Sequence, residues 1–231
     1  MAYQKPTFVT DEIYHIYNRG VEKRKIFPET HDYSRMVRNL YKLNDKNAAL
    51  HPRYQPKRNS ARRKNLPREP LVEILAFVLM PNHYHLALRQ TTENGVVKFM
   101  QKLDVGYAMY FNKKNERVGP LFQGRFRATH IDTDEYLRNL LGYIHTNPVD
   151  LAENFQDRIS EKMDFLEKYR WSSFLDYVGI ENFPTITTRD FLSEIMGGSE
   201  GIRASANAWI AHREEKRGII PEISEIVSYG I

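Results

Sequence analysis

Two histidines separated by one residue are the first feature of this sequence that could carry out chemistry. His83 and His85 flank Tyr84, directly after a Pro81-Asn82 break. Side chains alternate between the two faces of a strand, so both imidazoles should leave one face while Tyr84 leaves the other. Neutral imidazole is a common ligand of divalent ions, and the pair therefore predicts a metal site. Ordinary surface or core histidines are the alternative explanation.

A tyrosine and an asparagine one helical turn apart form the second candidate. Tyr143 and Asn147 are four residues apart, which places them on one face of a helix. We expect this helix to end near Asn147 because Pro148 follows. A helical wheel places both side chains at the edge of the buried stripe, facing along the sheet, whereas His145 projects away from Tyr143. A packed tyrosine and a helix-ending asparagine are the alternatives without chemistry.

The basic residues point to an anionic partner. The first 148 residues hold 25 Lys and Arg against 14 Asp and Glu, whereas the remainder holds 9 against 15. This asymmetry favours nucleic acid as the partner, with a solvated surface as the alternative. The segment 45–70 has eight basic residues and four prolines, so we expect a flexible basic loop that contacts phosphate. The candidate DNA-contacting residues are Arg89, Arg125 and Arg127, together with Lys57, Arg58, Arg62, Arg63 and Lys64 in the loop.

The pattern of apolar residues around these candidates predicts an α+β protein. Strands joined by hairpins and helices, without a regular βαβ repeat, are typical of a sheet flanked by helices. Asp132 and Glu135 have capping-box spacing and predict the start of the helix that carries Tyr143. The predicted strands cover 12–20, 71–80, 83–90 and part of 119–131. The last of these strands would carry Arg125 and Arg127 on one face. The predicted helices cover 31–43, 94–112 and about 132–147.

Length and composition limit the class of protein. The 231 residues suit one domain with an appendage, so we expect a catalytic domain over 1–150 and a mainly helical extension over 151–231. The absence of cysteine excludes thiolate zinc sites and cysteine nucleophiles. The longest apolar run, 74–80, is too short to span a membrane, and the N-terminus lacks a signal-peptide pattern. We therefore expect a cytoplasmic protein with no membrane partner.

Three stretches of the sequence together resemble a known family. They read FVLMPNHYHLALRQ, GPLFQGRFRATHIDTDEYLRNLLGYIHTNPVD and YRWSSFLDYVG, and they follow YHIYNRG in the first strand. In this order, from about residue 14 to 179, they resemble the REP-associated tyrosine transposases of the single-tyrosine HUH superfamily. The resemblance implies a ferredoxin-like core with a central antiparallel sheet. It also implies metal-dependent cleavage and rejoining of single-stranded DNA beside repeats that form hairpins.

The resemblance also implies roles for individual residues. His83 and His85 match the metal-binding pair, Tyr143 matches the nucleophile, and Asn147 stands where many relatives have a glutamine that completes the metal site. A tyrosine with a pKa near 10 is a poor nucleophile at neutral pH, so a metal must polarise the phosphodiester. We expect Mg²⁺ or Mn²⁺ as cofactor, a 5′-phosphotyrosine intermediate, single-stranded or hairpin DNA as partner, and a monomer or homodimer.

Two other functions are compatible with the same residues. A domesticated protein of the same fold could bind hairpin DNA with little turnover. A metal-dependent phosphodiesterase could use activated water, which would leave Tyr143 without a task. A covalent protein–DNA adduct would distinguish the transposase-like activity from both.

Overall fold

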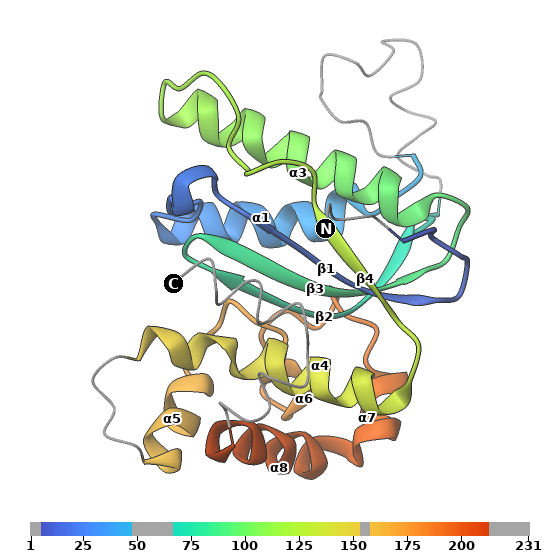
Figure 1. The fold of residues 1–231 in the computed structure, drawn as a ribbon, viewed down its shortest axis with the longest axis vertical. Coiled ribbons are helices and arrows are strands. Elements are labelled where there is room, and N and C mark those ends of the chain that lie inside the picture. Colours follow the sequence, from blue (N-terminus) through green and yellow to red (C-terminus); the bar gives the residue numbers. More distant parts are fainter. Residues whose placement is uncertain (1–5, 48–66, 153–157, 213–231) are drawn as a thin grey trace.

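A four-stranded antiparallel sheet lies at the centre of the structure, between two groups of helices (Figure 1). The computed structural model describes residues 6–47, 67–152 and 158–212. The loop residues Lys57, Arg58, Arg62, Arg63 and Lys64 therefore lie outside the described residues. The strand order is β2-β3-β1-β4, and the α+β fold with a ferredoxin-like sheet is confirmed. The strands are β1 (Ile13–Arg19), β2 (Val72–Met80), β3 (His83–Gln90) and β4 (Arg127–Ile131).

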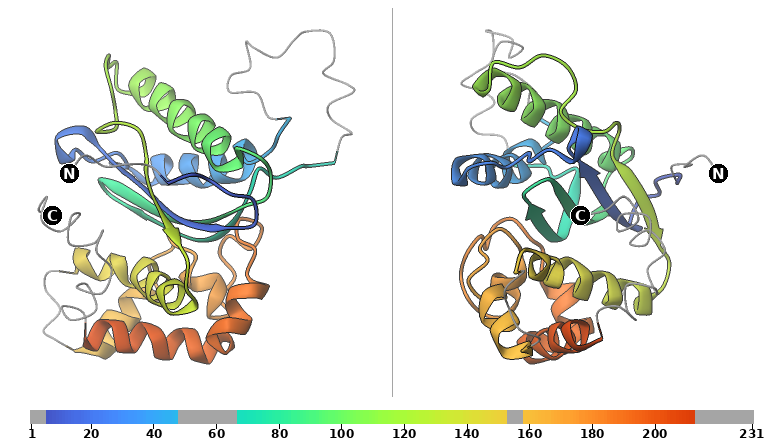
Figure 2. Two further views of the ribbon diagram at one scale, coloured as in Figure 1. Left: turned by 45° about the vertical axis from the view of Figure 1, so that its right-hand side comes forward. Right: turned by 60° about the vertical axis from the view of Figure 1, so that its left-hand side comes forward.

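The helices cover both faces of the sheet (Figure 2). On one face lie α1 (Thr30–Leu43) and α3 (Gly95–Lys114). On the other face lies α4 (Asp134–Thr146), with the remaining helices beside and behind it. These are α5 (Ile159–Leu166), α6 (Phe174–Tyr177), α7 (Asp190–Met196) and α8 (Gly198–Ala211); two short 3₁₀ helices are η1 (Val21–Lys23) and η4 (Asn147–Leu151). Within the described ranges, no helix has the length and apolar character needed to cross a membrane.

The alternation of β3 divides the interior into two hydrophobic cores. Tyr84, Leu86 and Leu88 join the core shared with α1 and α3. Ala87 joins the core shared with α4 and α8 on the opposite face. The predicted alternation is therefore confirmed, and it leaves His83 and His85 on the side of α4. β2 contributes to both cores, which explains its continuous apolar run.

The outer edge of β2 is covered by residues 171–173. The Leu79 amide donates to the Trp171 carbonyl at 2.9 Å, and the Ser173 amide donates to the Phe77 carbonyl at 2.9 Å. The Phe77 amide in turn donates to Ser173 Oγ at 3.0 Å. The YRWSSFLDYVG stretch thus protects an edge strand whose polar groups would otherwise be exposed.

The start of α4 differs from the prediction, whereas its end at Thr146, next to Asn147, is confirmed. Thr133, rather than Asp132, is the N-cap, because its side chain accepts a hydrogen bond from the Tyr136 amide at 3.2 Å. At the other end Asn147 keeps helical angles, φ −51° and ψ −40°, and the chain continues as η4. Pro148 is tolerated there because it lies in the first turn of the new helix. Asn147 is therefore not a simple stop.

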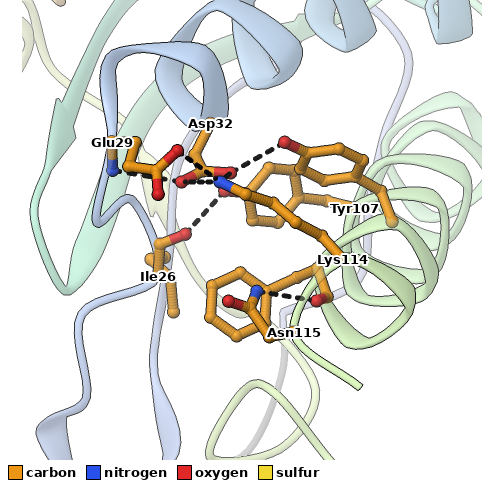
Figure 3. Close-up of polar contacts among 8 residues, drawn as sticks. Ile26, Glu29, Asp32, Tyr107, Lys114 and Asn115 are labelled. Atoms are coloured by element: carbon orange, nitrogen blue, oxygen red, sulfur yellow. Dashed lines mark hydrogen bonds and ion pairs between the residues drawn. The ribbon is translucent and has the colours of Figure 1, made fainter. Parts of the chain in front are cut away.

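A buried carboxylate joins α1 to α3 on the opposite face of the sheet (Figure 3). The Asp32 side chain has no exposed surface, and Lys114 Nζ lies 2.8 and 2.9 Å from its two oxygens. Asp32 also accepts from the Tyr110 hydroxyl at 2.8 Å and from the Glu29 amide at 3.1 Å. These contacts raise the pKa of Lys114, with the hydrogen bond to Asp32 as the largest cause. The cluster fixes the helix pair that supports the sheet.

The substitution Asp32→Ala should lower the free energy of unfolding by about 3 kcal/mol, because it removes the shared acceptor of three buried or half-buried donors. Urea unfolding measures this change. The control is Glu69→Ala, which removes a surface ion pair with Lys46 whose side chains are 46% and 52% exposed. The control should change the free energy by at most about 0.5 kcal/mol. Equal losses in the two variants would contradict the role given to Asp32.

Candidate active site

His83 and His85 lie side by side on the face of β3 that is turned toward α4. Their ring centroids are 5.0 Å apart with an interplanar angle of 84°. His83 is half-buried, and its Nδ1 contacts Asn82 Oδ1 at 2.6 Å. An amide oxygen only accepts, so this contact places the His83 proton on Nδ1 and leaves the lone pair on Nε2. Such support of the second ring nitrogen is typical of metal-binding histidines.

Tyr143 reaches from α4 to His85. The hydroxyl lies 3.2 Å from His85 Nε2, and the two ring centroids are 5.0 Å apart at 80°. Both side chains are buried. The position of α4 depends on Gly142, since a Cβ atom there would come within 2.1 Å of the Trp209 ring of α8. Trp209 therefore packs directly against the helix turn that carries Tyr143, with ring centroids 6.1 Å apart.

Asn147 brings an oxygen to the same place. The residue is 2% exposed, and its Oδ1 has no hydrogen-bond partner among the described residues. A buried oxygen without a donor is uncommon and calls for an explanation such as a bound ion. The side chain lies close enough to His83 to raise the pKa of that histidine. The side chain therefore lies beside the histidine pair, and its role as a ligand stays a prediction.

Burial keeps the histidines of this cluster neutral. The pKa of His83 is lowered to about 4, chiefly by burial and also by Arg19, while Asn147 and Asp150 oppose the change. Burial also lowers the pKa of His85 well below its ordinary value, and the neighbouring histidines add to the effect. Neutral imidazole is the protonation state that binds a metal, so the pair is ready for coordination at neutral pH.

The available donors fit a divalent ion. They are two imidazole nitrogens and one amide oxygen, which leave positions for phosphate and water. Among the described residues, no group of three or more histidine or acidic side chains is placed to hold a metal. The fit of these residues to a divalent ion therefore depends on two features. The Asn147 oxygen lacks a hydrogen-bond partner among the described residues, and Asn82 sets the tautomer of His83.

Comparisons with known proteins identify a family model and a solved structure that are similar to this chain. Residues 57–147, which include β2, β3 and α4, match the family described as "Transposase IS200 like". Over this segment the chain is similar to IS200-like transposases. The solved structure of a REP-associated tyrosine transposase bound to a REP hairpin is 15% identical, with a TM-score of 0.51. The match covers 82% of this chain and 96% of that chain, which establishes a shared fold. A comparison with curated proteins finds no match.

Three arginines lie near the histidine pair. Arg19 of β1 pairs with His83 across the sheet, and Arg127 of β4 pairs with Tyr17, the partner of His85. Arg125 lies before β4, not on it as predicted, and it is exposed. Arg125 and Arg127 nevertheless line the same hollow of about 230 Å³ together with Arg19.

Arg89 is not brought to this cluster. Its guanidinium forms an ion pair with Glu73 and lies over the Phe191 ring, 4.9 Å from the centroid. It is also four residues along β3 from His85, or about 13 Å at the usual rise of a strand. We therefore leave Arg89 out of the proposed DNA-contacting residues.

His15 and Arg19, both of β1, are residues of the site that sequence reasoning did not identify. His15 Nε2 lies 2.9 Å from His85 Nδ1, the two rings stack with centroids 5.1 Å apart, and His15 is fully buried. A metal on His85 Nε2 requires the His85 proton on Nδ1, where His15 Nε2 would accept it. The sequence feature that could have indicated His15 is its position within YHIYNRG. It lies two residues before Tyr17 and therefore on the same face of β1.

Two other histidines, His130 and His145, lie away from this cluster. His130 is exposed and contacts Glu12 at 2.8 Å. His145 is buried on the far side of α4, where Nε2 lies 3.0 Å from Ser173 Oγ. Since Ser173 donates its own proton to the Phe77 carbonyl, His145 must donate through Nε2. Its burial lowers the pKa to about 3.

His145 should make the protein acid-sensitive. Its pKa is about 3 when folded and about 6.5 when unfolded, so the unfolded state binds more protons below pH 6.5. Stability should therefore fall as the pH falls, with about 2 kcal/mol lost through His145 alone between pH 7 and pH 5. Urea unfolding at both pH values should show this loss reduced in His145→Gln. Ser173→Ala keeps the imidazole and should keep the loss. An unchanged loss in His145→Gln would contradict the assignment.

Proposed function

We propose that this protein cleaves and rejoins single-stranded DNA with Tyr143 as the nucleophile. The observation that carries the proposal is the 3.2 Å contact between the Tyr143 hydroxyl and His85 Nε2. This contact supports the proposal because it brings a phenol hydroxyl next to a candidate metal ligand. The family match to IS200-like transposases supports a role in DNA processing, and the REP hairpin in the similar structure supports hairpin DNA as the substrate class.

The residues present can carry out a balanced transesterification. The Tyr143 oxygen forms a bond to the scissile phosphorus while the bond from phosphorus to the 3′ oxygen breaks. The phenol proton is matched by the proton that the released 3′-hydroxyl gains, so no nucleotide cofactor is consumed. The product is a 5′-phosphotyrosine, which keeps the phosphodiester energy and allows rejoining.

His83, His85 and Asn147 would hold Mg²⁺ or Mn²⁺. The ion would polarise the phosphodiester and stabilise the negative charge that develops during attack. Asn82 would hold the His83 proton on Nδ1, and His15 Nε2 would accept a proton from His85 Nδ1, while burial keeps the rings neutral. Arg19, Arg125 and Arg127 would contact the DNA phosphates next to this centre.

Tyr143→Phe should abolish the covalent adduct with a hairpin oligonucleotide in Mg²⁺ or Mn²⁺. It should leave hairpin binding within a few-fold, because only the hydroxyl is lost and the ring still packs. Denaturing gel electrophoresis detects the adduct, and fluorescence anisotropy measures binding. Tyr136→Phe makes the same change two turns earlier on α4 and should retain the adduct.

Three results would contradict this assignment of Tyr143. An adduct in Tyr143→Phe would show that another residue is the nucleophile. Cleavage by the parent without an adduct would favour water as the nucleophile. Hairpin binding without cleavage at saturating metal would favour a binding protein.

Asn147→Ala should raise the metal concentration needed for half-maximal cleavage by at least about tenfold, the lower range for loss of support to a metal site. Asn147→Asp supplies a charged oxygen at the same reach and should retain metal binding. His83→Ala serves as the reference for a lost ligand, and calorimetric titration with Mn²⁺ and DNA measures affinity directly. If both Asn147 variants respond to metal as the parent does, Asn147 is not a ligand.

A further inference from the structure

Both ring nitrogens of His85 are in contact with other side chains. Nδ1 lies 2.9 Å from His15 Nε2, and Nε2 lies 3.2 Å from the Tyr143 hydroxyl. Each ring nitrogen of an imidazole has a single position, which holds either a proton or a lone pair. His85 can therefore bind a metal only if one of these two contacts is broken.

The contact with His15 is the more constrained of the two. The two histidines lie on adjacent strands, β1 and β3, whose pairing register is fixed. Their rings stack with centroids 5.1 Å apart, and His15 is fully buried. The Tyr143 hydroxyl instead lies at the end of a rotatable side chain on α4, outside the sheet. Nε2 is therefore the nitrogen that a metal can reach, and the Tyr143 hydroxyl is the group that must move.

The other candidate ligands differ from His85. Asn147 Oδ1 has no hydrogen-bond partner among the described residues. The contact of His83 with Asn82 uses Nδ1, so it does not occupy Nε2. In this arrangement the Tyr143 hydroxyl thus occupies the His85 position of the proposed metal site.

We propose that the Tyr143 hydroxyl competes with the metal for His85 Nε2, so that metal binding and release of the nucleophile are one exchange. With the His85 proton on Nδ1, the Tyr143 hydroxyl donates to Nε2, and the exchange breaks this hydrogen bond without net transfer of a proton. The released hydroxyl can then turn to the scissile phosphate. The histidine would thus hold the nucleophile back until the metal is bound. The proposal rests on the proposed function, since it concerns the same metal and the same nucleophile.

The competition has a predictable size. A hydrogen bond contributes about 1 kcal/mol net, which corresponds to about fivefold in affinity. The parent should therefore bind the metal about fivefold more weakly than a variant that lacks the hydroxyl. A hydroxyl that served as a further ligand would have the opposite effect.

The test measures binding of Mn²⁺ alone to the full chain without DNA, so it does not depend on cleavage. The electron paramagnetic resonance signal of free Mn²⁺ gives the affinity at a fixed neutral pH. Tyr143→Phe removes the hydroxyl and keeps the ring. Tyr177→Phe is the matched control, since Tyr143 and Tyr177 are both 4% exposed, but the Tyr177 hydroxyl donates to the Leu75 carbonyl at 2.6 Å.

A second measurement follows the hydroxyl itself in the parent protein. The NMR resonance of the ring carbon that bears the Tyr143 hydroxyl responds to the hydrogen bonding of that oxygen, and its loss in Tyr143→Phe assigns it. Titration with Mg²⁺, which is diamagnetic, should shift this resonance as the metal site fills. The corresponding Tyr177 resonance should stay in place.

Tyr143→Phe should bind Mn²⁺ about fivefold more tightly than the parent, and Tyr177→Phe should bind it as the parent does. Equal or weaker binding by Tyr143→Phe, or an unmoved Tyr143 resonance at saturating Mg²⁺, would overturn the competition alone. Absence of Mn²⁺ binding in all three proteins would overturn the metal site of the proposed function as well.

Discussion

The pairing register between β1 and β3 is the constraint on which the site depends. It sets Tyr17 opposite His85 and Arg19 opposite His83. A slip of one residue in β3 would turn both histidines into the core beneath α3 and expose Tyr84 to α4. The buried Tyr84 hydroxyl, bonded to Asp104 at 2.5 Å, opposes that slip. The hydrophobic side of β3 therefore determines on which side of the sheet the two histidines lie.

Burial on the α4 side converts this register into a reactive arrangement. His85 lies between His15 on the neighbouring strand and Tyr143 on α4, and all three side chains are buried. Desolvation keeps the imidazoles neutral, and the low local polarity strengthens the interactions of any bound ion. α8 contributes through Trp209, which packs on Gly142. The helices after residue 151 therefore support the site, although the domain boundary at 150 remains a prediction.

The strands, the main helices and the central residues of the candidate site could be predicted from the sequence. Each of them follows from the regular spacing of residues along a single strand or helix. Alternation placed His83 and His85 on one face, and helical spacing brought Tyr143 and Asn147 together. His15 was missed because it contacts His85 from another strand, 70 residues away in the sequence. The spacing of residues within one strand does not indicate such a long-range contact. Three further features depend on geometry that the spacing of residues does not provide. They are the Thr133 side-chain contact that caps α4, the position of Arg125 before β4, and the ion pair between Arg89 and Glu73.

The central claim is that β3 and α4 build one metal-dependent active site around Tyr143. Crystals of the Tyr143→Phe protein grown with Mn²⁺ and a hairpin oligonucleotide test it most directly, through anomalous scattering from manganese. We predict one strong peak in contact with His83, His85 and a phosphate of the DNA, next to the ring of residue 143. Absence of a peak at saturating Mn²⁺, or a peak bound by other residues, would contradict the account.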